Sequence, residues 1–318
     1  MSCLHDVNSY PKIKMNKCAI IGGSGFIGKN LLGYLDHLQM DCTSIPRADL
    51  FDIKTIDFDA YETVIDLAGL AHDISNCQDD EPYYRANFEL TKKLYDRFLT
   101  SNATKFIFIS SVKASADEVD GVLTESMMPS PKTVYGKTKL MAEQYITRQE
   151  LPQEKQYYIL RPCMTHGQGN KGNLNLLYKI IENGVPYFLA GFNNKRSFLS
   201  VENLCFIIHE LIVRNDIKSD VYNVADDIAL STNQVVSILA SSLHRKPRLW
   251  KVAPKIIYLL AGLGDLLHLP FTTERLTKLT ENYVVSNAKI KAAIKKSLPL
   301  SAVDGLIITA TSFSKTNK

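Results

Sequence analysis

The chain has 318 residues, of which 45% are hydrophobic and 22% are charged, as in a globular protein large enough for one large domain or two moderate ones. Its formal net charge of +4 is small and argues against the concentrated basic surface of nucleic-acid-binding proteins. Six cysteines lie apart, with no CxxC pair and no Cys/His cluster. This spacing indicates neither a metal site nor a disulfide framework, and it favours a reducing, cytoplasmic compartment.

We expect neither the N-terminal segment nor the longest apolar run to span a membrane. Residues 1–14 are polar and have no apolar core, so we expect a disordered leader and no signal peptide. Met15 stands just before the first expected strand and is a candidate for the true start. The longest apolar run, Ile256–Leu269, contains Asp265 and is too short to cross a bilayer. We expect a buried helix there, with an interfacial helix as the alternative.

Short apolar, β-rich runs alternate with helix-length amphipathic segments over the first two thirds of the chain, which predicts βαβ units. The expected strands are Lys17–Ile21, Cys42–Ile45, Thr63–Leu67, Phe106–Ser110 and Tyr157–Leu160. The expected helices between them are Gly25–Leu38, Pro82–Ser101 and Thr133–Gln149. The order predicts an α/β fold with a Rossmann-type, doubly wound parallel sheet.

The first expected strand runs directly into a glycine-rich turn that precedes a helix. Glycines in such a turn let the backbone approach a pyrophosphate, whose charge the helix N-terminus stabilises. The spacing Gly23-x-Gly25-x-x-Gly28 is the dehydrogenase form, whereas Gly22-x-x-Gly25-x-x-Gly28 is the short-chain dehydrogenase/reductase form. In either form, the strand–turn–helix context predicts a dinucleotide site.

The end of the second expected strand bears on which nicotinamide nucleotide fits. An acidic residue there hydrogen-bonds the ribose of NAD, whereas an arginine meets the 2′-phosphate of NADP. No acid closes the strand at Ile45, and Arg47 follows it closely. NADP(H) is therefore favoured, and NAD(H) remains the alternative if Arg47 is a solvated loop residue.

Tyr135 and Lys139 stand four residues apart at the start of a predicted helix and therefore share one face. A phenol has a pKa of about 10, and lowering it to about 7 requires roughly 4 kcal/mol, which a neighbouring ammonium and an oxidised nicotinamide would supply. Such a tyrosine exchanges a proton with a hydroxyl or ketone while hydride moves at the same carbon. The preceding strand ends in Ser110-Ser111, which predicts a hydroxyl beside the reacting oxygen.

After Arg161 the pattern changes to a Gly/Asn-rich loop followed by shorter elements. The expected elements are a helix opening at Asn173, a strand around Tyr187–Leu189, a helix Val201–Val213, a strand Val221–Val224 and a helix Thr232–Leu243. We expect a dinucleotide-binding domain over residues 15–165, to which 195–215 returns. Residues 166–194 and 216–318 would form a smaller substrate-binding lobe.

The motifs GGSGFIG, DLAG, Asn87, SSVK, YGKTK and RP, in this order, resemble those of extended short-chain dehydrogenases/reductases of the NAD-dependent epimerase/dehydratase family. The resemblance covers roughly residues 16–300. It implies a cytoplasmic, homodimeric enzyme that uses a nicotinamide cofactor and acts on a nucleotide sugar such as a UDP-sugar.

The resemblance also implies a role for individual residues. Ser111, Tyr135 and Lys139 would be catalytic, and Ser111, Asn173 and Arg196 would contact the substrate, with Arg196 on its diphosphate. Together with Arg47, the cofactor-binding set would be Gly22, Gly25, Phe26, Ile27, Gly28, Asp49, Leu50, Leu67, Ala68, Gly69, Asn87, Tyr135 and Lys139. Asp66 stands where the family usually has histidine or a similar residue.

The resemblance leaves the reaction open. Dehydratases of this family carry an Asp-Glu pair after the hydroxyl residue, and the segment Val112–Ala114 has no carboxylate, which argues against a 4,6-dehydratase. With Arg47 favouring NADPH, we expect reduction of a UDP-4-keto-6-deoxy-N-acetylhexosamine for polysaccharide synthesis. A 4-epimerase of UDP-GlcNAc or UDP-Glc with tightly bound NAD is the alternative. A non-catalytic NAD(P)-binding sensor is an alternative of another class.

Overall fold

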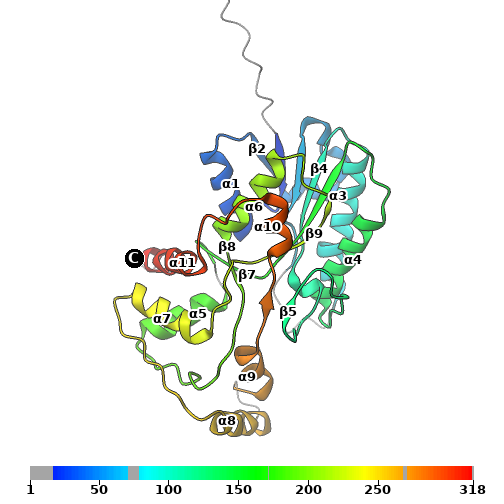
Figure 1. Ribbon diagram of the computed structural model, residues 1–318. Coiled ribbons are helices and arrows are strands. Elements are labelled where there is room, and N and C mark those ends of the chain that lie inside the picture. The colour runs from blue at the N-terminus through cyan, green and yellow to red at the C-terminus, as the bar shows by residue number, and fades with distance from the viewer. Residues whose placement is uncertain (1–16, 71–78, 171, 268–270, 317–318) are drawn as a thin grey trace, which may run out of the picture.

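The computed structural model describes residues 17–70, 79–170, 172–267 and 271–316 (Figure 1). The leader expected over residues 1–14, and Met15, lie outside these ranges. A six-stranded parallel sheet in the order β2-β1-β3-β4-β6-β9 forms the centre. Its strands are β1 (Cys18–Ile21), β2 (Cys42–Ile45), β3 (Thr63–Asp66), β4 (Lys105–Ile109), β6 (Gln156–Pro162) and β9 (Asp220–Val224).

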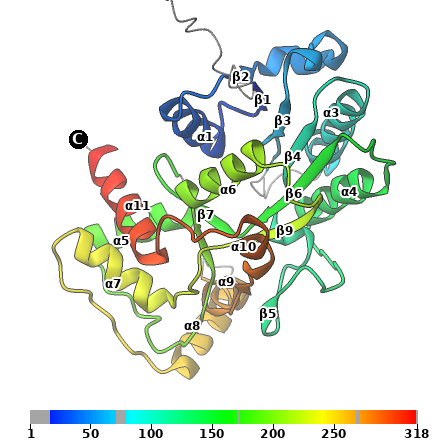
Figure 2. The same cartoon turned by 45° about the horizontal axis from the view of Figure 1, so that its top comes forward.

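Helices cover both faces of this sheet, because its strands are apolar on both sides. On one face, Ile20, Ile65 and Ile107 pack against α1 (Phe26–His37), α6 (Val201–Val213) and α10 (Ala288–Ile294). On the other face, Val64, Phe106 and Phe108 pack against α3 (Leu90–Leu99) and α4 (Val134–Arg148). This arrangement confirms the expected Rossmann-type, doubly wound parallel sheet (Figure 2).

Short elements connect the sheet to these helices. They are the 3₁₀ turns η1 (Arg47–Phe51), η2 (Ile53–Thr55), η3 (Phe58–Ala60) and η5 (Val112–Ala114), the single turn α2 (Glu81–Tyr83) and the π-helical turn η4 (Tyr84–Glu89). The expected helix Pro82–Ser101 is therefore three consecutive segments, α2, η4 and α3, with wider winding in the middle.

A second group of helices lies beside the sheet. The helices α5 (Asn173–Glu182), α7 (Thr232–Ser242) and α11 (Ala302–Thr316) share one apolar core (Figure 2). The helices α8 (Pro254–Leu266) and α9 (Thr273–Thr280) share another, smaller one. Two short parallel pairs, β7 (Met164–His166) with β8 (Phe198–Ser200) and β5 (Val122–Leu123) with β10 (Val284–Val285), join these parts to the sheet.

Three expectations are corrected here. Strand β9 pairs with β6 in the central sheet, so the segment 216–318 does not belong entirely to a separate lobe. Tyr187 and Leu189 form only isolated bridges, with Leu249 and Lys251, instead of a strand. The apolar run expected as a buried helix forms α8, but most of its large side chains are exposed. No helix among the described residues is long and apolar enough to cross a membrane.

Two buried lysines close the ends of helices on opposite faces of the sheet. Lys105 Nζ, at the start of β4, donates to the carbonyls of Leu211 and Arg214 at the end of α6, at 3.1 and 2.8 Å. Lys155 Nζ donates to the carbonyls of Phe98 and Ser101 at the end of α3, at 3.0 and 2.7 Å. Burial lowers the pKa of Lys105 to about 8, so it remains largely charged at neutral pH.

Replacing Lys105 with methionine should lower the free energy of unfolding by about 1–3 kcal/mol, because buried carbonyls at the end of α6 lose their donor. Urea unfolding followed by circular dichroism measures this change. The control is Lys93→Met, at an exposed position of α3, which should stay within about 0.5 kcal/mol of the parent. Equal unfolding midpoints for the two variants would contradict this role of Lys105.

Candidate active site

The glycine loop joins β1 to α1 with no room for side chains. Gly22 has φ +85°, and a Cβ there would lie 3.0 Å from the amide nitrogen of Ala68. A Cβ on Gly28 would lie 2.4 Å from the carbonyl oxygen of Gly22. Gly25 holds the N-cap position of α1, where it has no side chain to satisfy the first amides of the helix. The loop and these amides fit the pyrophosphate of a dinucleotide.

The end of β2 lies against this loop. A Cβ on Gly23 would lie 2.3 Å from Ser44 Oγ, so the loop and the strand are in close contact. Arg47, Asp49 and Leu50 follow the strand in η1, where Arg47 and Asp49 are exposed and Leu50 is half-buried. The structure thus places the exposed guanidinium after the strand that borders the glycine loop.

The segment after β3 brings three more predicted residues together. The amide of Leu67 donates to Ile21 at 2.9 Å, which continues the pairing of β3 with β1. A Cβ on Gly69 would lie 2.9 Å from Asn87 Oδ1 and 2.9 Å from Lys139 Nζ. Only glycine therefore leaves room at this crossing of β3, η4 and α4.

Asn87 is fully buried in the π-helical turn. Its Oδ1 accepts a hydrogen bond from the amide of Leu70 at 2.7 Å. Its Nδ2 donates to the carbonyl of Leu70 and to Thr138 Oγ1, each at 3.2 Å. Single π turns often occur at functional sites because the wider winding redirects a side chain. Here that side chain joins the segment after β3 to α4, next to Lys139.

Ser111 and Tyr135 meet at the carboxyl end of β4. Thr133 caps α4, its Oγ1 accepting from the amide of Gly136 at 3.2 Å, and this sets Tyr135 in the first turn. A Cβ on Gly136 would lie 2.4 Å from the carbonyl oxygen of Lys113, so the helix start packs on the segment after Ser111. Burial raises the pKa of the Tyr135 phenol, and a hydrogen bond with Ser111 opposes this rise.

Lys139 lies one turn after Tyr135, and its ammonium is directed into the protein. Nζ donates to the carbonyls of Ile109 and Ala68 at 2.9 and 3.3 Å. Burial lowers its pKa to about 8, against the opposing charges of Asp66 and Glu143. The lowered phenol pKa expected for Tyr135 requires the charge of an oxidised nicotinamide as well as the ammonium; in the protein alone, burial is the largest influence on Tyr135 and raises its pKa.

The two carboxylates near Lys139 are held rigidly. Asp66 is fully buried at the end of β3, where it accepts from the amide of Ala68 at 3.0 Å and from Thr91 Oγ1 at 2.8 Å. Burial raises the pKa of Asp66, and the charge of Lys139 opposes this. Position 66, where the resemblance implies histidine or a similar residue, thus carries a buried acid whose charge acts on Lys139.

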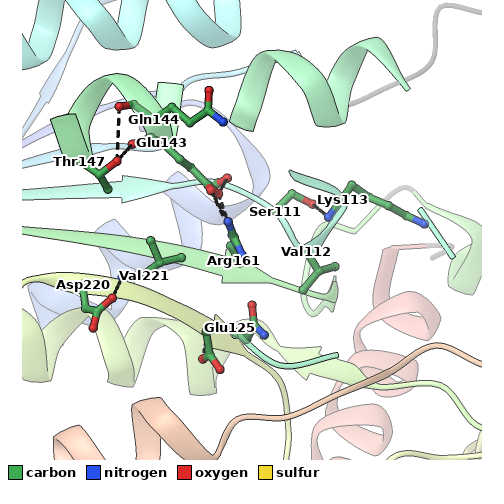
Figure 3. Close-up of polar contacts among 12 residues, drawn as sticks. Ser111, Val112, Lys113, Glu125, Glu143, Gln144, Thr147, Arg161, Asp220 and Val221 are labelled. Atoms are coloured by element: carbon green, nitrogen blue, oxygen red, sulfur yellow. Dashed lines mark hydrogen bonds and ion pairs between the residues drawn. The ribbon is translucent and has the colours of Figure 1, made fainter. Parts of the chain in front are cut away.

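Glu143 forms a buried ion pair with Arg161 of β6 (Figure 3). Arg161 Nε donates to both carboxylate oxygens of Glu143, at 2.9 and 3.1 Å, and Ser110 Oγ also donates to this carboxylate. Tyr135, Lys139 and Glu143 are spaced four residues apart along α4, so they lie along one face of the helix. The pair ties α4 to the ends of β4 and β6.

The predicted substrate residues lie farther along the chain. Arg196 is half-buried before β8, donates to the carbonyl of Lys278 at 2.6 Å and lies 3.7 Å from the carboxylate of Glu281. Its charge, with those of Glu281 and Lys278, acts on Lys113, which sits two residues after Ser111. Arg196 thus neighbours the segment that carries Ser111. Asn173 is exposed at the start of α5.

Tyr283 contacts both the loop after β4 and the segment that carries Arg196. Its hydroxyl donates to the carbonyl of Ala116 at 2.6 Å, and its ring lies 4.5 Å from Lys113 Nζ. The amide of Tyr283 donates to the carbonyl of Lys195 at 2.8 Å. This tyrosine therefore fixes Arg196 and α9 relative to the loop after β4.

The sequence model of the NAD-dependent epimerase/dehydratase family matches residues 18–225. This chain belongs to that family. It is thus an enzyme of a nicotinamide-dependent family, as its motifs predict, and the glycine loop has the shape to hold such a cofactor.

Two relatives match most of the chain. The UDP-glucose 4-epimerase of Vibrio cholerae is 28% identical, over 96% of this chain and 98% of that protein. The N-acetyl-α-D-glucosaminyl-diphospho-ditrans,octacis-undecaprenol 4-epimerase of Escherichia coli O157:H7 is 27% identical, over 86% of this chain and 83% of that protein. Among solved structures, MoeE5 in complex with UDP-glucuronic acid and NAD superposes with a TM-score of 0.74 at 19% identity, covering 94% of this chain and 99% of MoeE5.

Several residues of this family member's site were not predicted from the sequence. Glu143, Arg161 and Tyr283 are buried polar groups whose partners come from distant segments. A sequence signal was present for Glu143, because it continues the four-residue spacing of Tyr135 and Lys139 on α4.

Replacing Gly28 with alanine should abolish binding of the nicotinamide nucleotide, because the new Cβ would collide with backbone atoms of the loop that approaches the pyrophosphate. The matched control is Gly33→Ala in the same helix, where a Cβ meets no atom within 4 Å. This control should bind normally and gain about 0.5–1 kcal/mol of stability. Calorimetric titration with NAD(H) and NADP(H) measures the affinity of each variant. Equal affinities for the two variants would contradict a pyrophosphate site in the glycine loop.

Proposed function

We propose that this protein is a UDP-sugar 4-epimerase that uses a nicotinamide cofactor. The observation that carries the proposal is the position of Tyr135 in the first turn of α4, which packs on the segment after Ser111, one helical turn before the buried ammonium of Lys139. The similarity to two 4-epimerases over most of the chain supports it.

In the proposed reaction, Tyr135 accepts the proton of the sugar 4-hydroxyl, and Ser111 hydrogen-bonds the same oxygen. The bound cofactor supplies the hydride acceptor and then the hydride donor. Tyr135 returns its proton to the ketone oxygen after the sugar has turned its other face, so no net oxidation occurs. Because burial raises the phenol pKa, the positive charge of an oxidised nicotinamide is needed to favour the phenolate.

A 4-keto reductase with NADPH, the reaction favoured by the sequence, is the second candidate. The observation in its favour is the exposed Arg47, which follows the strand that borders the glycine loop. A reductase releases its cofactor at each turnover, whereas an epimerase retains NAD. The nucleotide that copurifies with the protein therefore separates the two candidates.

The substrate diphosphate would lie near Arg196 and Lys113, because the two cations neighbour each other beside the loop that carries Ser111. Guanidinium groups bind phosphates in a bidentate manner. In this arrangement Arg196 would exchange its ion pair with Glu281 for the diphosphate. The division into a cofactor domain, now including β9, and a substrate lobe remains part of the same proposal. So do the sugar contact of Asn173, the cytoplasmic location and the homodimer.

Replacing Tyr135 with phenylalanine should lower kcat by about 10²–10⁴ without unfolding the protein, because the phenol carries the proton. The control is Tyr145→Phe, on the same helix as Tyr135, which removes a hydroxyl that donates to Asp96 of α3 and should keep most activity. Interconversion of UDP-glucose and UDP-galactose, and of their N-acetylated forms, measures the effect. Unchanged turnover by the Tyr135 variant would contradict the proposal.

Replacing Arg47 with serine should weaken NADPH binding by about ten-fold and leave NADH binding unchanged if this guanidinium meets the 2′-phosphate. Fluorescence titration of both reduced nucleotides gives the ratio. The control is Arg85→Ser, which removes an exposed guanidinium paired with Glu81. An equal loss of affinity for NADPH and NADH in the Arg47 variant would show that Arg47 does not distinguish the two nucleotides.

A further inference from the structure

The helix α8 exposes an unusually apolar surface. Its buried stripe is narrow, consisting of Ile257, Ala261 and Gly264 packed toward α9. The other large side chains of the helix and the residue after it are exposed: Ile256, Tyr258, Leu259, Leu260, Leu263, Leu266 and Leu267. Leu259 and Leu266 are 66% and 73% exposed. A contiguous exposed patch of this kind marks an interaction surface in a folded protein.

The chain that leads into α8 is basic and has no acid. From His244 to Gly264 there are five cationic residues and no Asp or Glu: Arg245, Lys246, Arg248, Lys251 and Lys255, all exposed. Arg245 and Arg248 donate to the carbonyls of Glu182 and Gly184, which carry no formal charge. Their positive charges are thus not neutralised by these contacts.

Asp265, the first acid after this run, is already engaged. Its carboxylate accepts from the amide and hydroxyl of Thr273 at 3.2 and 2.6 Å, which joins α8 to the start of α9. The exposed apolar side chains thus lie on α8, the outermost element at one end of the molecule in Figure 1, and Lys251 and Lys255 lie just before and at the start of this helix.

We propose that α8 docks this enzyme on an anionic lipid bilayer. Amphipathic helices that lie in the membrane interface combine apolar side chains with flanking lysine and arginine, which are attracted to anionic headgroups. With 13 residues, α8 is about 20 Å long, shorter than the hydrocarbon core of about 30 Å, so it lies along the surface. The positive charge of the preceding segment is attracted to anionic headgroups, so it favours an anionic bilayer over a protein partner without acidic residues.

Docking through α8 has a consequence for the proposed reaction. Arg196, the proposed diphosphate contact, donates to the carbonyl of Lys278 in α9, and α9 packs on α8. The carrier at the far side of the diphosphate would then point toward the bilayer. This step deepens the proposed function, on which it rests, by favouring a sugar diphosphate carried on a lipid at the membrane surface.

Flotation of the full chain with vesicles tests the docking without substrate. The protein should float with phosphatidylglycerol/phosphatidylethanolamine vesicles at low salt and much less with phosphatidylcholine vesicles. Leu259→Gln/Leu266→Gln should lower the bound fraction by about ten-fold. The control Leu176→Gln/Ile228→Gln changes two residues that are 61% and 62% exposed elsewhere and should bind like the parent.

A second pair of variants tests the charges. Lys251→Glu/Lys255→Glu should reduce binding to the anionic vesicles, whereas Lys54→Glu/Lys93→Glu, at exposed positions of η2 and α3, should not. Turnover of a soluble UDP-sugar by all variants reports on folding and on the proposed function separately. Absence of flotation overturns the docking even if the enzyme is active. Light scattering without lipid tests the other occupant. A dimeric parent and a monomeric Leu259/Leu266 variant would assign the patch to a second copy of the chain instead.

Discussion

The buried ammonium of Lys139 is the constraint on which the site depends. A charge removed from water must be stabilised by nearby dipoles and counter-charges, or its pKa falls until it is neutral. Here the carbonyls of Ile109 and Ala68 and the carboxylates of Asp66 and Glu143 keep the pKa at about 8, so the group remains largely protonated at neutral pH. These partners come from the ends of β3 and β4 and from α4, and their positions are therefore fixed together.

The same constraint extends to the neighbouring strand. Glu143 faces the lysine and is also paired with Arg161 of β6, while Ser110 of β4 donates to it. A buried pair of this kind contributes little net stability, but losing one partner would leave the other charge unpaired. Its effect is to hold α4 against the sheet edge, where the first turn of the helix packs on the segment after Ser111. The proposed catalytic geometry is thus preorganised, whereas in the proposed reaction the phenolate still requires the charge of the cofactor.

The sequence predicted those parts of the fold that follow from local pattern. The central strands β1, β2, β3, β4 and β6 are apolar runs bounded by turn residues, and their ends were correct within two residues. The π turn at Asn87 was missed because i→i+5 winding leaves no apolar periodicity. Glu143 was missed because a carboxylate on an amphipathic helix is usually solvated, and only tertiary packing buries it. Strand β9 was assigned to the wrong part because pairing order cannot be read from one strand alone.

The interpretation of α8 shows where hydrophobicity alone is ambiguous. A run of leucines predicts removal from water, but it does not say whether protein or lipid does the covering. The structure limits the protein contribution to a stripe of small side chains and Ile257, because α9 has only eight residues and covers one side of α8. The remaining apolar area adjoins a segment with cations and no acids, which a bilayer complements better than a protein core does. Arg196 donates to a carbonyl of α9, and α9 packs on α8. The proposed lipid-binding surface and the proposed diphosphate contact are therefore connected through α9.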